Sequence, residues 1–412
     1  MDDHLRVIDQ PRPSICVVGA GAAGLVAAIF AARVGATVQV IERTPDGGKK
    51  ILISGGGRCN VLPSSLATER FVTDSSAQLM RRLLRSWPLA QQRAFFEDDL
   101  QIRLAVEEES GKVFPVSNRA RDVRDALVQH ARALNVRFDF NVALCGLERV
   151  NDAWTVQTSA GPMAAACVVL ATGGLSVPAT GSDGTGLRIA GSLGHRINAV
   201  YPALTPVVAD PAVHADLSGV SLPVRVRARS SERSAEATGG FLFTHRGYSG
   251  PAVLDISHVA TRDRSAALRV QWTEDSAEQW NGRLTRHGVA VNTVLASRVP
   301  QRLAARLMHE AGVASDRRTT DLRRDERVAL IQRLTSYELP WTGDEGFRKA
   351  EVTGGGIALD DVNPQTLESR RHRGLFLCGE MLDAFGPIGG HNFAWAWATG
   401  RLAGLGAANA FR

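Results

Sequence analysis

The chain has 412 residues, of which 44% are hydrophobic and 22% charged, and its formal net charge is +6. This composition is that of a globular protein long enough for two domains. Basic residues alternate with acidic ones, as in 317–327, and such mixed runs are typical of solvated helix faces, so we expect no nucleic-acid partner. The cysteines show no metal or disulfide spacing, which predicts no metal site and favours a reducing cytoplasm: Cys16, Cys59, Cys145, Cys167 and Cys378.

The first element that the sequence predicts is a βαβ unit over residues 15–42. The β-branched run 15–18 indicates a buried parallel strand, an Ala-rich helix follows, and 38–41 indicates a second strand. The alternative is a signal peptide or membrane span. Glycines interrupt the apolar run and acidic residues precede it, so we expect no membrane partner.

The glycines between this strand and helix have G-x-G-x-x-G spacing, which has a chemical reason. The first permits a tight turn, the second lets backbone approach a pyrophosphate, and the third lets the helix pack on the strand. The helix N-terminus offers N–H groups to phosphates, and an acid ending the second strand accepts hydrogen bonds from a ribose. We therefore predict a dinucleotide site that includes Gly19, Gly21, Ala22, Ala23, Gly24, Glu42 and Arg43.

A second glycine-rich segment, ILISGGGRCN, covers residues 51–60. Three consecutive glycines let backbone pass close to a flat or anionic group. Arg58 adds a charged fork and Asn60 an amide, whereas Cys59 lacks a neighbouring cysteine for redox chemistry. A plain glycine turn is the alternative. We assign to the cofactor site Lys50, Ser54, Gly56, Gly57, Arg58, Cys59 and Asn60.

Alternating helices and strands are predicted next: a helix over 75–98 broken at Trp87-Pro88, a strand and turn over 111–118, a helix over 121–134, and strands over 136–142, 153–158 and 166–174. The last of these strands ends in ATGG, whose small residues bring backbone amides to the cofactor. The predicted site therefore also includes Val142, Ala171, Thr172 and Gly173.

The pattern changes at about residue 196, where short strands and turns precede helices over 289–312 and 324–334. We predict an inserted α+β domain, β-barrel-like plus helical, over 196–345. It separates two parts of an FAD-binding domain, 1–195 and 346–412. His245 and Tyr248, in the distinctive FLFTHRGYSGP segment, are candidate catalytic residues, and a structural turn is the alternative.

The last part of the chain returns to α/β character. A buried strand over 374–380 ends in Gly-Glu, and a glycine turn then opens a helix. A helix N-terminus stabilises the negative charge that develops on a reduced flavin, so this position suits FAD. No second G-x-G-x-x-G follows a strand, which argues against a separate nicotinamide domain. We assign to the site Gly379, Glu380, Asp383, Gly389, Gly390, His391, Asn392 and Phe393.

Seven motifs make the chain resemble the BaiN/RdsA-type (YhiN-like) bacterial NAD(P)/FAD-dependent oxidoreductases. They are GAGAAG at Gly19, ILISGGGRCN at Ile51, KVFPVSNRA at Lys112, LATGG at Leu170, FTHRGYSGPAVL at Phe243, EVTGGGI at Glu351 and LFLCGEMLDAFGPIGGHNFAWAWATG at Leu375. The resemblance implies a glutathione-reductase-like FAD domain, α/β in class and built from both chain ends, with an insertion. The chain departs from the family pattern at His391, where Tyr is usual, and at Phe393, where Leu is usual.

The resemblance also implies hydride transfer at flavin N5, with NADPH or NADH as donor and an unsaturated or oxo small molecule as acceptor. His391 is the first candidate for moving a proton, because an imidazole titrates near neutral pH. A flavin oxidase acting on a small amine or hydroxyl substrate, and a flavin-binding electron carrier, remain as alternatives. The sequence does not fix the oligomeric state.

Overall fold

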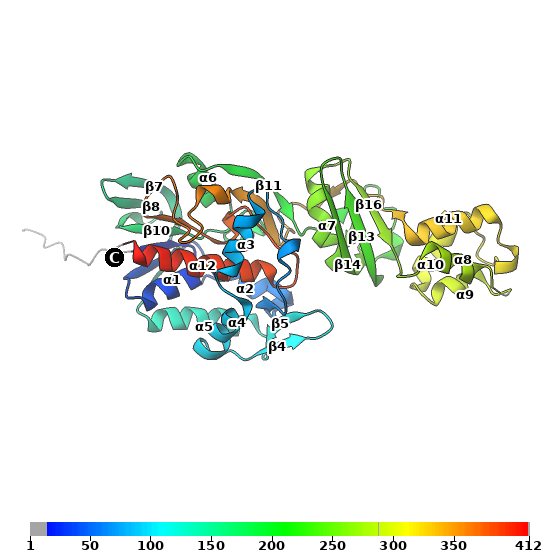
Figure 1. Cartoon of the computed structure of the whole chain (residues 1–412), viewed down its shortest axis with the longest axis horizontal. Helices are drawn as coiled ribbons and strands as arrows, with labels where there is room; N and C mark the ends of the chain where they lie inside the picture. The colour runs from blue at the N-terminus through cyan, green and yellow to red at the C-terminus, as the bar shows by residue number, and fades with distance from the viewer. Residues whose placement is uncertain (1–14, 287, 411–412) are drawn as a thin grey trace, which may run out of the picture. The chain divides into compact units, whose positions relative to one another are not determined.

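The computed structural model describes residues 15–286 and 288–410, so the first fourteen residues of the predicted domain 1–195 lie outside the described part. The chain forms two compact units (Figure 1). The first contains residues up to Val200 and from Thr353 onward, and the second contains Tyr201–Val352. The predicted insertion, 196–345, covers most of the second unit.

A five-stranded parallel sheet forms the centre of the first unit, in the order β20-β10-β1-β2-β6. The strands are β1 (Ile15–Val18), β2 (Val38–Glu42), β6 (Arg137–Phe140), β10 (Cys167–Leu170) and β20 (Leu375–Leu377). β1, β10 and β20 are buried along their whole length, as expected for parallel strands covered on both faces. Because β20 pairs with β10 and β10 with β1, the two chain ends build one sheet.

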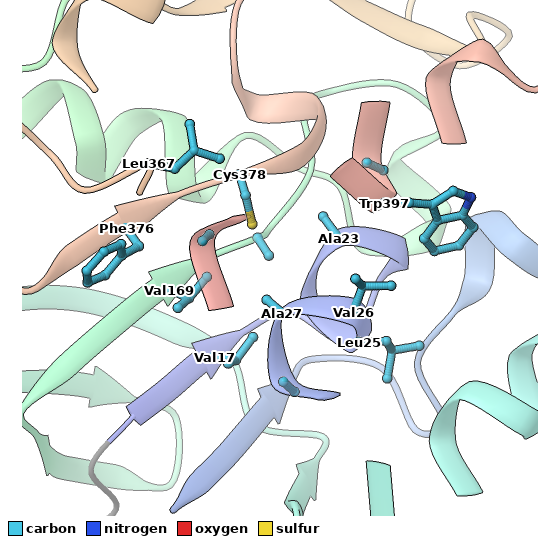
Figure 2. Close-up of a cluster of buried hydrophobic side chains, with 14 of the residues drawn as sticks. Val17, Ala23, Leu25, Val26, Ala27, Val169, Leu367, Phe376, Cys378 and Trp397 are labelled. Atoms are coloured by element: carbon cyan, nitrogen blue, oxygen red, sulfur yellow. The ribbon is translucent and has the colours of Figure 1, made fainter. Parts of the chain in front are cut away.

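Two helices from opposite ends of the sequence, α1 (Ala22–Arg33) and α12 (His391–Asn409), lie side by side (Figure 1). Figure 2 shows Ala23 and Ala27 of α1 in the hydrophobic core, near Cys378 and Trp397. Glycines on α12 allow this approach: a Cβ at Gly400 would lie 2.3 Å from the Ala23 carbonyl oxygen, and one at Gly404 would lie 2.2 Å from that of Ala27.

The other elements of the first unit surround this centre. Two three-stranded antiparallel sheets have the orders β3-β5-β4 and β7-β8-β9. Their strands are β3 (Leu62–Pro63), β4 (Leu104–Glu107), β5 (Lys112–Pro115), β7 (Leu144–Val150), β8 (Ala153–Thr158) and β9 (Gly161–Ala165). The helices are α2 (Lys49–Ile53), α3 (Ala77–Arg85), α4 (Leu89–Ala94), α5 (Ala120–Ala133) and α6 (Thr185–Ser192). The predicted break near Pro88 therefore separates α3 from α4.

The chain leaves the first unit along β11 (Ile197–Ala203) and returns along β19 (Val352–Ile357), and these two strands pair with each other. β19 contains the EVTGGG motif and is buried throughout. A Cβ at Gly355 would lie 2.1 Å from the carbonyl oxygen of Ala199, so glycine is needed where the two strands meet.

The second unit has a seven-stranded sheet and five helices among its described residues. The strand order is β17 (Tyr337–Glu338), β16 (Ala267–Gln271), β13 (Ser221–Arg229), β14 (Ser234–Phe243), β15 (Gly247–Ser249), β12 (Val207–Val208) and β18 (Gly343–Asp344). The helices are α7 (Pro251–Arg262), α8 (Ala277–Leu284), α9 (Val291–Ala296), α10 (Gln301–Glu310) and α11 (Arg324–Thr335).

Two expectations about this unit are corrected. The sheet is open, with β17 and β18 as its edges, so it is not barrel-like. The single helix predicted over 289–312 is two helices, α9 and α10, because Pro300 caps the second and lacks the N–H that a continuous helix needs.

The packing of α1 on α12 generates a stability prediction. Gly404→Ala should lower the free energy of unfolding by about 1–3 kcal/mol, because the added methyl group overlaps the Ala27 carbonyl. Gly282→Ala in α8 is the matched control: its methyl group meets nothing within 4 Å, so we expect stabilisation by roughly 0.5–1 kcal/mol. Urea titrations followed by circular dichroism measure both. Equal effects of the two substitutions would contradict the packing described here.

Candidate functional site

The three glycines after β1 differ in the space around them, as a dinucleotide loop requires. Gly19 has φ +104°, and a Cβ there would lie 2.6 Å from the Ala171 carbonyl oxygen. A Cβ at Gly24 would lie 1.8 Å from the Gly19 oxygen. At Gly21, which caps α1, a Cβ would meet nothing within 4 Å. The loop is therefore packed at its first and third glycines and open at its second, where a pyrophosphate would approach.

Glu42 ends β2 and is buried beside this loop. Its Oε2 accepts from the Ala20 N–H at 2.7 Å, and Oε1 accepts from the N–H and hydroxyl of Thr44. A carboxylate has about four acceptor positions, so one on Oε2 remains for a ribose hydroxyl. The side chain thus holds the glycine loop and can also bind a ligand.

The ILISGGGRCN segment forms the end of α2 and a tight turn with left-handed backbone at Gly55 and Gly56. Gly56 and Gly57 are exposed, and a Cβ at either would meet nothing within 4 Å. The Ser54 hydroxyl donates to the Ile51 carbonyl at 2.9 Å, which ties the turn to α2. The backbone at Gly56 and Gly57 is therefore exposed, with room for a group to approach it.

Cys59 and Asn60 are both buried, but only Asn60 makes hydrogen bonds to neighbouring segments through its side chain. Burial raises the pKa of the Cys59 thiol to about 12, so it is protonated at neutral pH and a poor redox group. With its amide oriented to satisfy both neighbours, Asn60 accepts from the Gly390 N–H at 2.9 Å and donates to the Leu62 carbonyl at 3.1 Å. Asn60 therefore joins the glycine-rich turn to the start of α12.

Lys50 and Glu380 form an ion pair at the carboxyl end of the parallel sheet. Lys50 Nζ also donates to the Ser176 hydroxyl, which in turn donates to Glu380 Oε1. Glu380 Oε1 accepts from the Thr353 N–H at 3.0 Å, and the Thr353 hydroxyl accepts from the N–H of Ser176 at 3.1 Å. Ligands of open α/β sheets bind at this end, so Lys50 and Glu380 lie where a cofactor could contact them.

Asp383 is held by the protein through one carboxylate oxygen, Oδ2. Only 1% of it is exposed. Its Oδ2 accepts from the Asn198 amide at 2.6 Å, and from three further groups: the Ser75 hydroxyl at 2.7 Å, the Asp74 N–H at 3.0 Å and the Thr73 hydroxyl at 3.2 Å. In this structure Asp383 ties β11 to the segment after β20, and that is a structural role.

His391 is the first residue of α12 and is buried. Its Nε2 lies 3.4 Å from the Ala67 backbone nitrogen, which donates to it. Burial lowers the pKa of the imidazole to about 4, so His391 is neutral at pH 7. Asn392 exchanges two 2.9 Å hydrogen bonds with the Gly386 backbone, and the Phe393 ring stacks on Trp397.

The remaining predicted residues of the first unit lie around the same sheet edge. Ala171 donates its N–H to the Val18 carbonyl, and a Cβ at Gly173 would lie 2.7 Å from the Ser182 hydroxyl. Thr172 contacts the backbone of Gly186 closely, since a Cβ there would lie 2.1 Å from the Thr172 hydroxyl. Val142 donates its N–H to the Glu42 carbonyl, and Arg43 pairs with Asp183.

The two candidate catalytic residues of the insertion belong to the second unit. His245 is exposed, whereas Tyr248 is fully buried in that unit's core. Burial raises the pKa of the Tyr248 phenol, whose oxygen lies 2.8 Å from Nδ1 of His214. Nε2 of His214 lies 3.1 Å from Glu310. His245 and Tyr248 therefore differ in their surroundings: His245 faces solvent, whereas Tyr248 belongs to a buried polar network with His214 and Glu310.

Ser176 and Thr353 are site residues that sequence reasoning missed. Both belong to segments with a visible signal: Ser176 follows the ATGG strand, and Thr353 precedes the triple glycine of EVTGGG. Nothing in their spacing showed that the two segments meet, because that contact depends on the paired crossover strands. The Ser176 hydroxyl and the Thr353 N–H both donate to Oε1 of Glu380.

The sequence comparisons agree on one family. The sequence model of the HI0933-like protein Rossmann domain matches residues 13–406. The chain is 32% identical over 407 residues to a Clostridium scindens protein named 3-dehydro-bile acid delta(4,6)-reductase, covering 96% of this chain and 98% of that one. It is 30% identical over 388 residues to the ribosomal RNA dihydrouridine synthase of Escherichia coli, covering 93% and 95%.

Solved structures show the same fold at low identity. A 3-ketosteroid-delta4-(5alpha)-dehydrogenase from Rhodococcus jostii, in complex with 4-androstene-3,17-dione, matches with a TM-score of 0.50 and 16% identity over 98% of both chains. A flavocytochrome c3 fumarate reductase also matches with a TM-score of 0.50 and 16% identity, over 97% of this chain and 78% of that one. The α/β fold predicted from the sequence, with its glycine-rich nucleotide loop, is confirmed.

The open second glycine gives a binding prediction. Gly21→Ala should change the free energy of unfolding by less than about 1 kcal/mol, because the site has room and φ of −79°. The methyl group would instead occupy the space a pyrophosphate needs, so we expect FAD affinity to fall at least about ten-fold. FAD titration of the apoprotein by fluorescence measures this. Gly146→Ala, with only ordinary contacts, is the control, and equal affinities for the two variants would contradict this role.

The buried histidine gives a pH prediction. The folded chain protonates His391 near pH 4 and the unfolded chain near pH 6.5, so its stabilisation is complete above pH 6.5 and is lost as the pH falls toward 4. In His391→Phe the decrease in unfolding free energy between pH 8 and pH 4 should be smaller, by up to about 3 kcal/mol. Urea titrations across that range measure it. The difference at pH 8 reports packing alone, and parallel curves for the two proteins would show that His391 is not the titrating group.

Proposed function

From the premise that this chain belongs to the HI0933-like Rossmann-domain family, whose members include flavin-dependent oxidoreductases, we propose that it reduces a carbon–carbon double bond conjugated to a carbonyl group. FAD is the proposed cofactor, and NADPH or NADH the proposed electron donor. The proposed acceptor is a small molecule. The proposed location is the cytoplasm, which the five free cysteines support.

The observation that carries this proposal is the chemistry common to two relatives. One is named for reducing the delta(4,6) bonds of a 3-dehydro bile acid, and the other for producing dihydrouridine. Both names describe hydrogen added across a double bond conjugated to a carbonyl. This chain aligns with each over more than nine-tenths of its length, which supports the same reaction class here.

The residues of the first unit suit this cofactor. When bound, FAD supplies hydride transfer, while the protein supplies position and electrostatics. The open backbone at Gly21 and the N-terminus of α1 would hold the pyrophosphate, and the free acceptor position of Glu42 would take a ribose hydroxyl. Because burial lowers the pKa of His391 to about 4, it would stand at the start of α12 as a neutral group, and the titration near neutral pH that made it the first candidate for moving a proton is not retained.

Uridine in RNA is the second candidate acceptor, because relatives in Escherichia coli and Haemophilus influenzae are named ribosomal RNA dihydrouridine synthases. We favour the small molecule, since exposed arginines of the second unit have acidic neighbours that offset their charge. Arg246 pairs with Glu345 and Arg269 with Glu338, for example, whereas Arg225 and Arg227 share Glu236. A phosphate backbone needs a cationic surface that is not already neutralised.

An anaerobic experiment tests the proposal in two steps. Adding NADPH or NADH to the holoprotein should bleach the flavin bands, and adding an enone such as a 3-oxo-4-ene steroid should restore them. Mass spectrometry should find two hydrogen atoms added to the acceptor. Reoxidation by a uridine-containing ribosomal RNA fragment, with no effect of enones, would favour the second candidate. A flavin that neither NADPH nor NADH reduces would contradict the proposal. That result would favour a flavin oxidase or a flavin-binding electron carrier.

A further inference from the structure

Three segments of the first unit meet beside the start of α12. They are the glycine-rich turn 54–60, the Gly389-Gly390 turn, and the β4–β5 hairpin. Asn60 hydrogen-bonds to Gly390, and a Cβ at Gly390 would lie 2.4 Å from the Leu62 carbonyl carbon. A Cβ at Gly389 would lie 3.9 Å from Cγ of Lys112, so the stem of that lysine lies against the turn. The three segments therefore form one continuous wall.

The guanidinium of Arg58 is fixed on this wall. It lies 3.9 Å from the centre of the Phe114 ring, in a cation–π contact. Its Nε donates to the Gly55 carbonyl at 3.3 Å, and Nη1 pairs with Glu107 at 3.0 Å. About two-fifths of the side chain stays exposed. A planar fork held on one edge and open on the other is prepared for a carboxylate or phosphate.

The second cation on the wall is Lys112, which is directly opposite Glu107 in the β4–β5 ladder. Glu107 is therefore the one carboxylate between two cations in this group of three side chains, and it is itself about two-fifths exposed. These three side chains carry one net positive charge, and the exposed carboxylates of Glu108 and Glu109 follow at the tip of the hairpin. A Cβ at either neighbouring glycine, Gly56 or Gly57, would meet nothing within 4 Å.

We propose that Arg58 and Lys112 recognise an anionic group, a phosphate or carboxylate, on a small molecule that reacts at the cofactor. Glu107 is their internal counter-ion and weakens this binding. The proposal rests on the proposed function in one respect: that function places the reaction beside the turn that starts α12. Two sources carry the required chemistry: the 2′-phosphate that distinguishes NADPH from NADH, and a carboxylate on the acceptor.

Charge-neutral variants of the holoenzyme test this. For the anionic partner, Arg58→Gln and Lys112→Gln should each raise KM about ten-fold, with kcat changed less than about two-fold. Glu107→Gln should act in the opposite direction and lower that KM about three-fold. Arg119→Gln, which removes an exposed arginine paired with Asp122 on α5, is the matched control and should leave KM unchanged. A purely structural role for the three residues would not reverse sign at Glu107.

Paired substrates identify the source of the anion. If the variants lose the preference for NADPH over NADH, Arg58 and Lys112 bind the 2′-phosphate. If they lose the preference for an acid over its methyl ester, the two residues bind a carboxylate of the acceptor. Unchanged preferences in an active enzyme overturn the proposal. If no nucleotide reduces the flavin, the proposed function fails instead. In that case the affinity for inorganic pyrophosphate, measured by quenching of flavin fluorescence, tests the anion site by itself. A lower affinity in Lys112→Gln than in Arg119→Gln supports anion binding by Arg58 and Lys112. Equal affinities in the two variants overturn it.

Discussion

The close contact between the first and last helices is the constraint on which the nucleotide site depends. α12 reaches α1 only because Gly400 and Gly404 carry no side chain. The same helix fixes Gly379, whose N–H donates to the Thr399 hydroxyl and whose carbonyl accepts from the Trp395 indole. A Cβ at Gly379 would in turn crowd Ala23 at 2.8 Å. Glu380 is therefore placed beside the dinucleotide loop by backbone packing.

The charged side chains at this site are hydrogen-bonded or paired within the protein. Glu42 accepts from the Ala20 N–H of the glycine loop and from the N–H and hydroxyl of Thr44, and Lys50 and Glu380 form an ion pair that Ser176 joins. Buried charges are tolerated when they are paired and hydrogen-bonded. The chain can thus present polar groups to a dinucleotide while each of these carboxylates is hydrogen-bonded within the protein. Arg58 and Lys112 differ, since they share one carboxylate.

The sequence was informative where a pattern has a local cause. The βαβ unit, the strand ends and the family were predicted correctly, because periodicity and glycine spacing are read along the chain. Contacts between distant segments were not: the role of Thr353 depends on the pairing of β11 with β19, and the Asp383 network depends on Asn198. The division of 289–312 was missed although Pro300 was visible. Helix α7 was also missed, although Pro251 stands at its first position, where proline is favoured.

The pairing of the crossover strands has a consequence for how such a chain can evolve. Paired strands lie about 5 Å apart, so the chain passes from the first unit to the second and back again at neighbouring points. A short β-hairpin turn has similar end-to-end dimensions, and none of the described residues of Tyr201–Val352 forms a strand of the parallel sheet. A lineage could therefore exchange, enlarge or lose this unit while keeping the nucleotide-binding part intact. One redox core could in this way acquire new acceptors by recombination rather than by point substitution.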